Sequence, residues 1–159
     1  MTERHSERMP LTKAAEFLLD ECRMVLPGIQ ALFGFQLIAV FSDGFTTKLD
    51  ARGQQLHLFA IGLVAIAVVL IMAPAAYSRQ TGVREITERF LRIATRLLLM
   101  SMLPLAIAIC IEFYLIAGII IGGSAALLAA ALFAIFLIFW FALPRVRALE
   151  RLLGSGDVS

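Results

Sequence analysis

The stretch Leu97–Leu143, LLLMSMLPLAIAICIEFYLIAGIIIGGSAALLAAALFAIFLIFWFAL, decides the class of this protein because it is apolar almost without pause. A helix that crosses a bilayer needs about 20 mainly apolar residues, so this stretch is too long for one span and suits two. Glycines cluster at its middle, in Gly118–Ser124, and predict the turn. We therefore expect spans at about 97–117 and 124–143, with Glu112 as the only acidic or basic residue of the stretch.

Two more apolar stretches precede it, at about 24–42 and 56–77. All of these runs are apolar at both odd and even positions, which argues against the alternating strands of a membrane barrel. The 159-residue chain is 60% hydrophobic and 16% charged, whereas soluble domains average about 45–50% apolar and about 25% charged. This composition excludes soluble, disordered and disulfide-stapled secreted proteins. We predict an all-α polytopic membrane protein with four transmembrane helices.

Lysines and arginines are unevenly distributed among the segments outside the spans. Four precede the first span, five lie between the second and third spans, and three follow the fourth. The first connection has only Lys48 and Arg52, and the Gly118–Ser124 turn has none. Because such residues collect on the cytoplasmic side, we expect both termini in the cytoplasm. The net charge of +2 is too small for a nucleic-acid partner, so the expected partner is the lipid bilayer.

Two segments beside the spans have helical periodicity. In Leu11–Leu26 the apolar residues recur with a 3.6-residue period, which favours an amphipathic interfacial helix on the inner membrane face. The alternative is a plain cytoplasmic extension of the first span. The second segment, Val83–Arg96, is expected to run into the third span. We expect one membrane domain at 11–150, between disordered tails at 1–10 and 151–159. The arginines expected to contact lipid headgroups, including those of anionic lipids, are Arg84, Arg89, Arg92 and Arg96.

Three polar residues inside the spans are candidates for a polar or ion pathway. Glu112 in the third span is costly to bury when ionised, so it should face a bundle interior, a partner or water. It lies about six residues from the Gly118–Ser124 turn, and the alternative is a position at the outer headgroups. Gln30 and Gln36 in the first span face different directions, because six residues rotate a helix by about 240° beyond a full turn. For these two residues the alternative is hydrogen bonding between helices.

Small residues recur every four positions from the predicted turn into the fourth span. Such a stripe lets two helix backbones approach closely. We expect it to pack against another helix, within the chain or in another subunit. This small-residue ladder consists of Gly118, Gly122, Ala126, Ala130 and Ala134.

The search for an enzyme site is negative. The two histidines are His5, in the N-terminal tail, and His57, at the predicted outer start of the second span. A metal site needs several ligands in a fixed geometry, and none of the common zinc, thiol, serine-hydrolase or phosphate-loop motifs is present. We expect no catalytic residues, no metal and no cofactor.

Three motifs resemble a known family: PGIQALFGFQ at Pro27–Gln36, APAAYSR at Ala73–Arg79, and WFALP at Trp140–Pro144. The family comprises small four-span bacterial membrane proteins catalogued as a domain of unknown function, and some members carry an automatic label of sodium:proton antiporter. The resemblance extends from about Leu18 to Pro144. It implies the four-span topology and a bacterial inner (plasma) membrane, but no established activity.

This chain departs from the family pattern at two positions. The family often has His where this chain has Ser78, and Asp near the end of the third span where this chain has Glu112. The first change removes any role for a histidine at that position, whereas the second keeps a carboxylate.

Two functions follow as hypotheses from these features. The first is a non-catalytic membrane module that oligomerises or binds a membrane-protein or lipid partner. The second is a homo-oligomeric ion channel or cation/proton transporter with Glu112, Gln30 and Gln36 in its polar pathway.

Overall fold

A computed structural model describes residues 10–81 and 87–146, and within these residues the chain is helical, without strands. Four of its helical stretches are long and apolar enough to cross a membrane, at Lys13–Ala39, Ala51–Arg79, Glu88–Ile121 and Ala125–Val146. The prediction of an all-α, multi-pass membrane protein with four spans is therefore confirmed. The elements are α1 (Leu11–Ala39), α2 (Asp43–Lys48), α3 (Ala51–Thr81), α4 (Glu88–Ile121), α5 (Ala125–Leu137) and the π-helical turn η1 (Ile138–Ala142).

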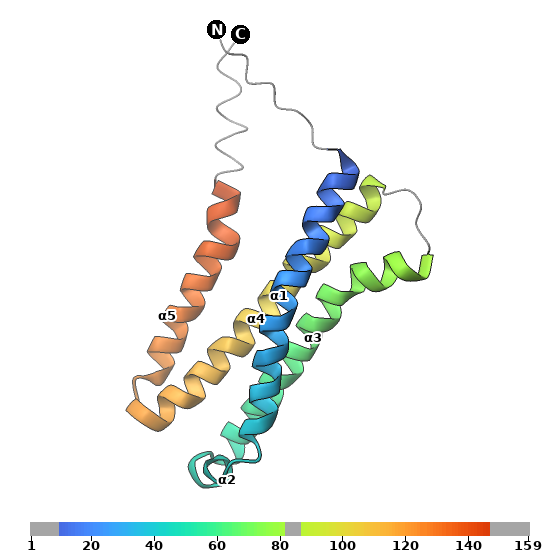
Figure 1. Cartoon of the computed structure of the whole chain (residues 1–159). Helices are drawn as coiled ribbons and strands as arrows, with labels where there is room; N and C mark the ends of the chain where they lie inside the picture. The colour runs from blue at the N-terminus through green and yellow to red at the C-terminus, as the bar shows by residue number, and fades with distance from the viewer. Residues whose placement is uncertain (1–9, 82–86, 147–159) are drawn as a thin grey trace.

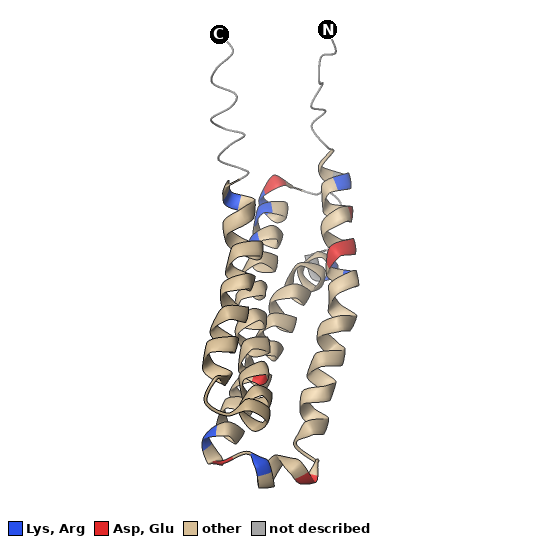
Figure 2. Ribbon diagram, turned by 90° about the vertical axis from the view of Figure 1, so that its left-hand side faces the viewer, with Lys and Arg blue, Asp and Glu red and all other residues tan. Residues whose placement is uncertain are grey.

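Helices α1, α3 and α4 pack together, and α5 lies beside α4 (Figure 1). At one end of the bundle α1 begins, α3 ends and α4 begins; we call this the Leu11 end. At the other end α1 ends, α2 follows, α3 begins, and α4 turns into α5; we call this the Gly122 end (Figure 1). Figure 2 shows most acidic and basic residues toward these two ends, which leaves a long middle section with few charged residues.

Each of the three packed helices buries a stripe that repeats every seven residues. A seven-residue repeat keeps one seam of a helix turned toward its neighbours along its whole length. Much of the core formed in this way consists of small side chains, so the backbones can approach closely. The stripes are Ala15, Cys22, Ile29 and Gln36 on α1; His57, Val64 and Ile71 on α3; and Ala94, Ser101, Ala108 and Leu115 on α4.

The beginning of the first span differs from the prediction of an interfacial helix. Residues 11–26 and the first span form one continuous helix, α1, with Pro27 inside it. The buried stripe of α1 begins at Ala15, so the amphipathic pattern reflects packing within the bundle. The alternative, an extension of the first span, is the arrangement that forms. Of the second segment, 83–86 lies outside the described residues, and from Glu88 onward α4 continues into the third span as predicted.

The turn between the last two spans is shorter than predicted. Helix α4 continues to Ile121, and it ends at Gly122, whose φ of 70° is open to glycine and strained for other residues. The chain reverses there, so the small-residue ladder does not lie on one helix. Gly118 belongs to α4, Gly122 belongs to the turn, and only Ala126, Ala130 and Ala134 share a face of α5.

Candidate functional site

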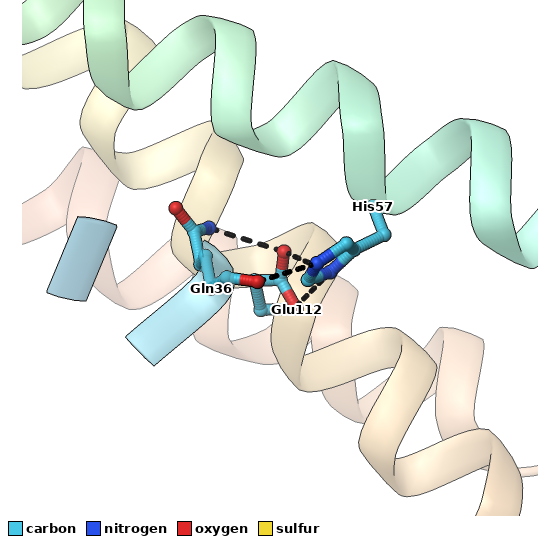
Figure 3. A network of polar contacts seen from close by, with 3 residues as sticks. All are labelled: Gln36, His57 and Glu112. Atoms are coloured by element: carbon cyan, nitrogen blue, oxygen red, sulfur yellow. Dashed lines mark hydrogen bonds and ion pairs between the residues drawn. The ribbon is translucent and has the colours of Figure 1, made fainter. Parts of the chain in front are cut away.

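Three polar side chains from three helices meet near the Gly122 end of the bundle (Figure 3). Gln36 comes from the end of α1, His57 from the second turn of α3, and Glu112 from α4. Gln36 is 4% exposed and His57 is 3% exposed, so both side chains are buried. We call these three residues the polar triad. The structure thus brings together two of the predicted residues, Gln36 and Glu112, with a third that the sequence did not single out.

Hydrogen bonds connect all three members of the polar triad. Gln36 Nε2 donates to Glu112 Oε1 over 3.1 Å. His57 Nδ1 lies 2.9 Å from Glu112 Oε1 and 3.1 Å from Oε2. His57 Nε2 lies 3.0 Å from the main-chain oxygen of Gln36. The carboxylate therefore joins α1 to α4 and α3 to α4, and the imidazole joins α3 to both other helices.

Each member of the polar triad occupies a packing position of its helix. Gln36 ends the buried seven-residue stripe of α1, and His57 begins the stripe of α3. Glu112 follows Leu98 and Leu105, two partly buried residues of α4, again at intervals of seven. The triad is therefore one layer of the bundle core, in which hydrogen-bonding groups stand where the stripe residues named above for the other layers are apolar apart from Ser101.

The structure favours a position of Glu112 in the bundle core over a position at the lipid headgroups. Helix α4 continues for nine residues beyond it, to Ile121, which corresponds to roughly 14 Å at 1.5 Å per residue. Its side chain is 18% exposed, and it contacts side chains of two other helices. The predicted turn at Gly118 had placed it closer to the end of the span.

Two further features lie at the Gly122 end of the bundle, one of them in contact with the polar triad. The ring of Phe45, in α2, meets the His57 ring edge-on at a centroid distance of 5.1 Å. A cavity of about 600 Å³ opens between the start of α3 and the end of α4, and its lining includes Arg52, Leu56 and Tyr114. Gln36 Oε1 is buried, and in the described part of the chain it has no hydrogen-bond partner.

The other candidate residues lie elsewhere. Gln30 is exposed on α1, away from the polar triad. Arg89, Arg92 and Arg96 are exposed near the start of α4, whereas Arg84 lies outside the described residues. All five residues of the small-residue ladder, Gly118, Gly122, Ala126, Ala130 and Ala134, are exposed. Residues 10–81 and 87–146 contain no group of three or more His, Cys, Asp or Glu side chains that could hold a metal ion.

The sequence does carry a signal for His57. The predicted boundary placed it at the very start of the second span, where a histidine is unremarkable. Yet His57, Ala60, Val64, Ala67 and Ile71 alternate at spacings of three and four, which is the pattern of a buried helix seam. A histidine that continues such a seam is a core residue in need of partners, and Gln36 and Glu112 are the polar residues at corresponding positions of their helices.

Comparison with known proteins gives one match. A family profile described as "Family of unknown function (DUF6328)" matches residues 2–144. No curated protein and no solved structure matches the chain.

Proposed function

The chain belongs to the family of unknown function DUF6328, and from that premise we propose a non-catalytic membrane module that assembles through α5. The observation that carries the proposal is the exposure of Ala126, Ala130 and Ala134. Around the same helix, about 100° from Ala126 and Ala130, Ala125 is buried and Ala129 is partly buried. The helix therefore uses one face within the chain and leaves the face with the small-residue ladder free.

Small residues on a free face favour a helix partner over lipid. Lipid tails are as apolar as leucine, so association in a membrane depends on close packing and hydrogen bonds rather than on removing apolar surface from water. An alanine stripe lets a second backbone approach closely, whereas lipid gains nothing comparable from it. A second copy of this chain supplies the same stripe, so we propose a homo-oligomer, with another membrane protein as the alternative partner.

The proposed setting is a bacterial inner membrane with both termini in the cytoplasm. Among residues 10–81 and 87–146, only two of the nine lysines and arginines, Lys48 and Arg52, lie at the Gly122 end. The other seven lie toward the Leu11 end, in the first halves of α1 and α4, at the end of α3 and after η1. This asymmetry is typical of a bundle whose Leu11 end is cytoplasmic.

Anionic lipids are a second proposed partner, at the Leu11 end. Arg89, Arg92 and Arg96 line a surface groove of about 630 Å³ at the start of α4. Arg89 also borders a cavity of about 540 Å³ between α3 and α4, whose lining is mostly apolar and includes Pro74 and Ile93. Guanidinium groups beside an apolar cavity suit a phosphate headgroup and the upper part of its acyl chain.

Native mass spectrometry of the protein in nanodiscs, with lipid retained, tests the assembly. We expect a closed oligomer for the unaltered chain and a smaller species for Ala130→Leu, because leucine blocks the close approach. The matched control is Ala131→Leu, the same change at an exposed position off the ladder, which should leave the mass unchanged. A monomer in the unaltered protein, or equal masses for all three proteins, would exclude assembly through this face.

The polar triad favours a second candidate, a homo-oligomeric cation or proton transporter. Ionisable groups within membrane spans commonly mark ion or proton pathways, and Glu112 and Gln36 lie together beside His57. Gln30 is exposed, so it could line a pathway only between subunits. Proton and cation flux into liposomes should then fall for Glu112→Gln, and flux equal to that of the unaltered protein would exclude this function for Glu112.

A further inference from the structure

The contacts of His57 determine where its protons lie. Its Nε2 is 3.0 Å from the main-chain oxygen of Gln36. A carbonyl oxygen only accepts, so Nε2 must carry a hydrogen and donate it. A neutral imidazole has one N–H group, and this contact already uses it.

The other ring nitrogen faces a carboxyl group. Nδ1 lies 2.9 Å from Glu112 Oε1 and 3.1 Å from Oε2. If the imidazole were neutral and Glu112 were ionised, a nitrogen lone pair would face oxygen lone pairs with no hydrogen between them. That arrangement is repulsive, so the observed distances require one more proton between Nδ1 and the carboxyl group.

We infer that His57 and Glu112 form a binding site for one proton, which the two side chains share. The proton makes either an imidazolium beside a carboxylate or an imidazole beside a carboxylic acid. Both forms contain the same number of protons and have no net charge, which suits a position where an unpaired charge is costly. This inference does not depend on assembly through α5, and it holds whether or not the protein transports ions.

Gln36 stabilises either form of the pair. Its Nε2 donates to Glu112 Oε1, and this oxygen can accept as part of a carboxylate or as the carbonyl of an acid. The Phe45 ring covers an edge of the imidazole. The proton site therefore lies among residues of α1, α2, α3 and α4.

No other described charge neutralises the site. The part of α1 from Met24 to Ala39 and the whole of α5 carry no acidic or basic residue, and Glu112 is the only one of α4 beyond Arg96. The nearest in sequence are Asp43 and Lys48 of α2, and Asp50 and Arg52 at the start of α3. Among residues 10–81 and 87–146, none of these four makes an ion pair with Glu112 or His57.

Loss of the shared proton therefore changes the contact between helices. It would leave one net negative charge in the core layer, and one of the two His57 contacts, to Glu112 or to the main-chain oxygen of Gln36, would have no hydrogen. The polar triad thus makes the packing of three helices depend on the presence of that proton.

Nitrogen NMR of histidine-labelled protein in nanodiscs tests the inference. The chain has two histidines, so a His5→Gln background leaves His57 as the only imidazole. The comparison is between this protein and the same protein with Glu112→Gln. The new amide can donate to Nδ1 and accept from Gln36, so the hydrogen bonds persist while the shared proton has no acidic partner.

With Glu112 present, both ring nitrogens of His57 should give the signal of a nitrogen that carries or shares a hydrogen. In the Glu112→Gln protein Nδ1 should instead accept from the new amide, and the same Nδ1 signal in both proteins would overturn the inference. A second observation needs no variant at Glu112: Nε2 should carry a hydrogen, because it donates to the main-chain oxygen of Gln36. An Nε2 without hydrogen would contradict the inferred arrangement directly.

Discussion

Replacing Glu112 by leucine, with glutamine as the matched control, tests the polar triad as a structural element. Leucine removes the partner of His57 Nδ1 and the partner of Gln36 Nε2, both on buried residues. Glutamine can supply both partners, since its amide nitrogen donates and its amide oxygen accepts. The two variants thus differ mainly in whether the polar groups of α1 and α3 stay hydrogen-bonded.

The expected loss for Glu112→Leu follows from these two contacts. In a protein interior, a buried group left without its partner costs about 1–3 kcal/mol, which gives about 2–6 kcal/mol for two groups. Hydrogen bonds between membrane helices average only about 0.6 kcal/mol, with a maximum near 1.7 kcal/mol, because the unfolded chain in a membrane also finds partners. The values for membrane helices apply to these spans, so for two contacts we expect a loss of about 1–3 kcal/mol in the free energy of unfolding. Glu112→Gln should lose less than half as much.

Unfolding by a denaturing detergent in mixed micelles, followed by circular dichroism, measures the difference. A loss of 1.4 kcal/mol corresponds to a tenfold change in the ratio of folded to unfolded protein, so the expected effect is resolvable. If Glu112→Leu is as stable as the unaltered protein, the two contacts of Glu112 contribute nothing and the reasoning fails. Equal losses for leucine and glutamine would show that the carboxyl group matters for some reason other than its two hydrogen-bond partners.

Three further changes test the polar triad, the small-residue ladder and the turn at Gly122. Gln36→Glu should destabilise the protein more than Gln36→Leu in the same detergent titration, because it places a second carboxyl group about 3.1 Å from that of Glu112. Ala130→Leu should reduce the oligomer mass in nanodiscs while Ala131→Leu leaves it unchanged, since only the first lies on the small-residue ladder. Gly122→Ala should lower stability by about 1–3 kcal/mol in thermal unfolding, because a side chain is strained at φ 70° although space is open around it.

The sequence predicts the architecture better than it predicts the site, and the reason is physical. Runs of about 20 apolar residues have few alternatives to spanning helices, so all four spans were predictable. The sequence determines the end of α4 less well, because each of Gly118, Gly122 and Gly123 can terminate a helix. The structure uses Gly122, the described residue with positive φ. Because α4 ends there, Glu112 lies farther from the end of its helix than the predicted end at 117 implied.

The polar triad shows what a single helix pattern cannot supply. Glu112 and Gln36 were identifiable as polar residues in apolar spans, but their partner depends on how three helices are rotated and aligned. His57 was missed because the predicted span began at position 56, which made it a boundary residue. In the structure α3 begins at Ala51, and His57 lies on its buried seam. Gln30 shows the converse, because it is equally polar but lies off the seam and is exposed.

The composition of the remaining core suggests why one polar layer is present at all. Small residues such as Ala60 and Ala67 on α3 and Ala108 on α4 are fully buried. A core of similar small side chains on seven-residue stripes packs almost equally well after a helix slides by one repeat. Polar groups remove this degeneracy, because a buried donor or acceptor is satisfied only when its partner lies at the same level. The layer formed by Gln36, His57 and Glu112 therefore favours one alignment of α1, α3 and α4, the one in which the contacts of Glu112 with Gln36 and His57 form.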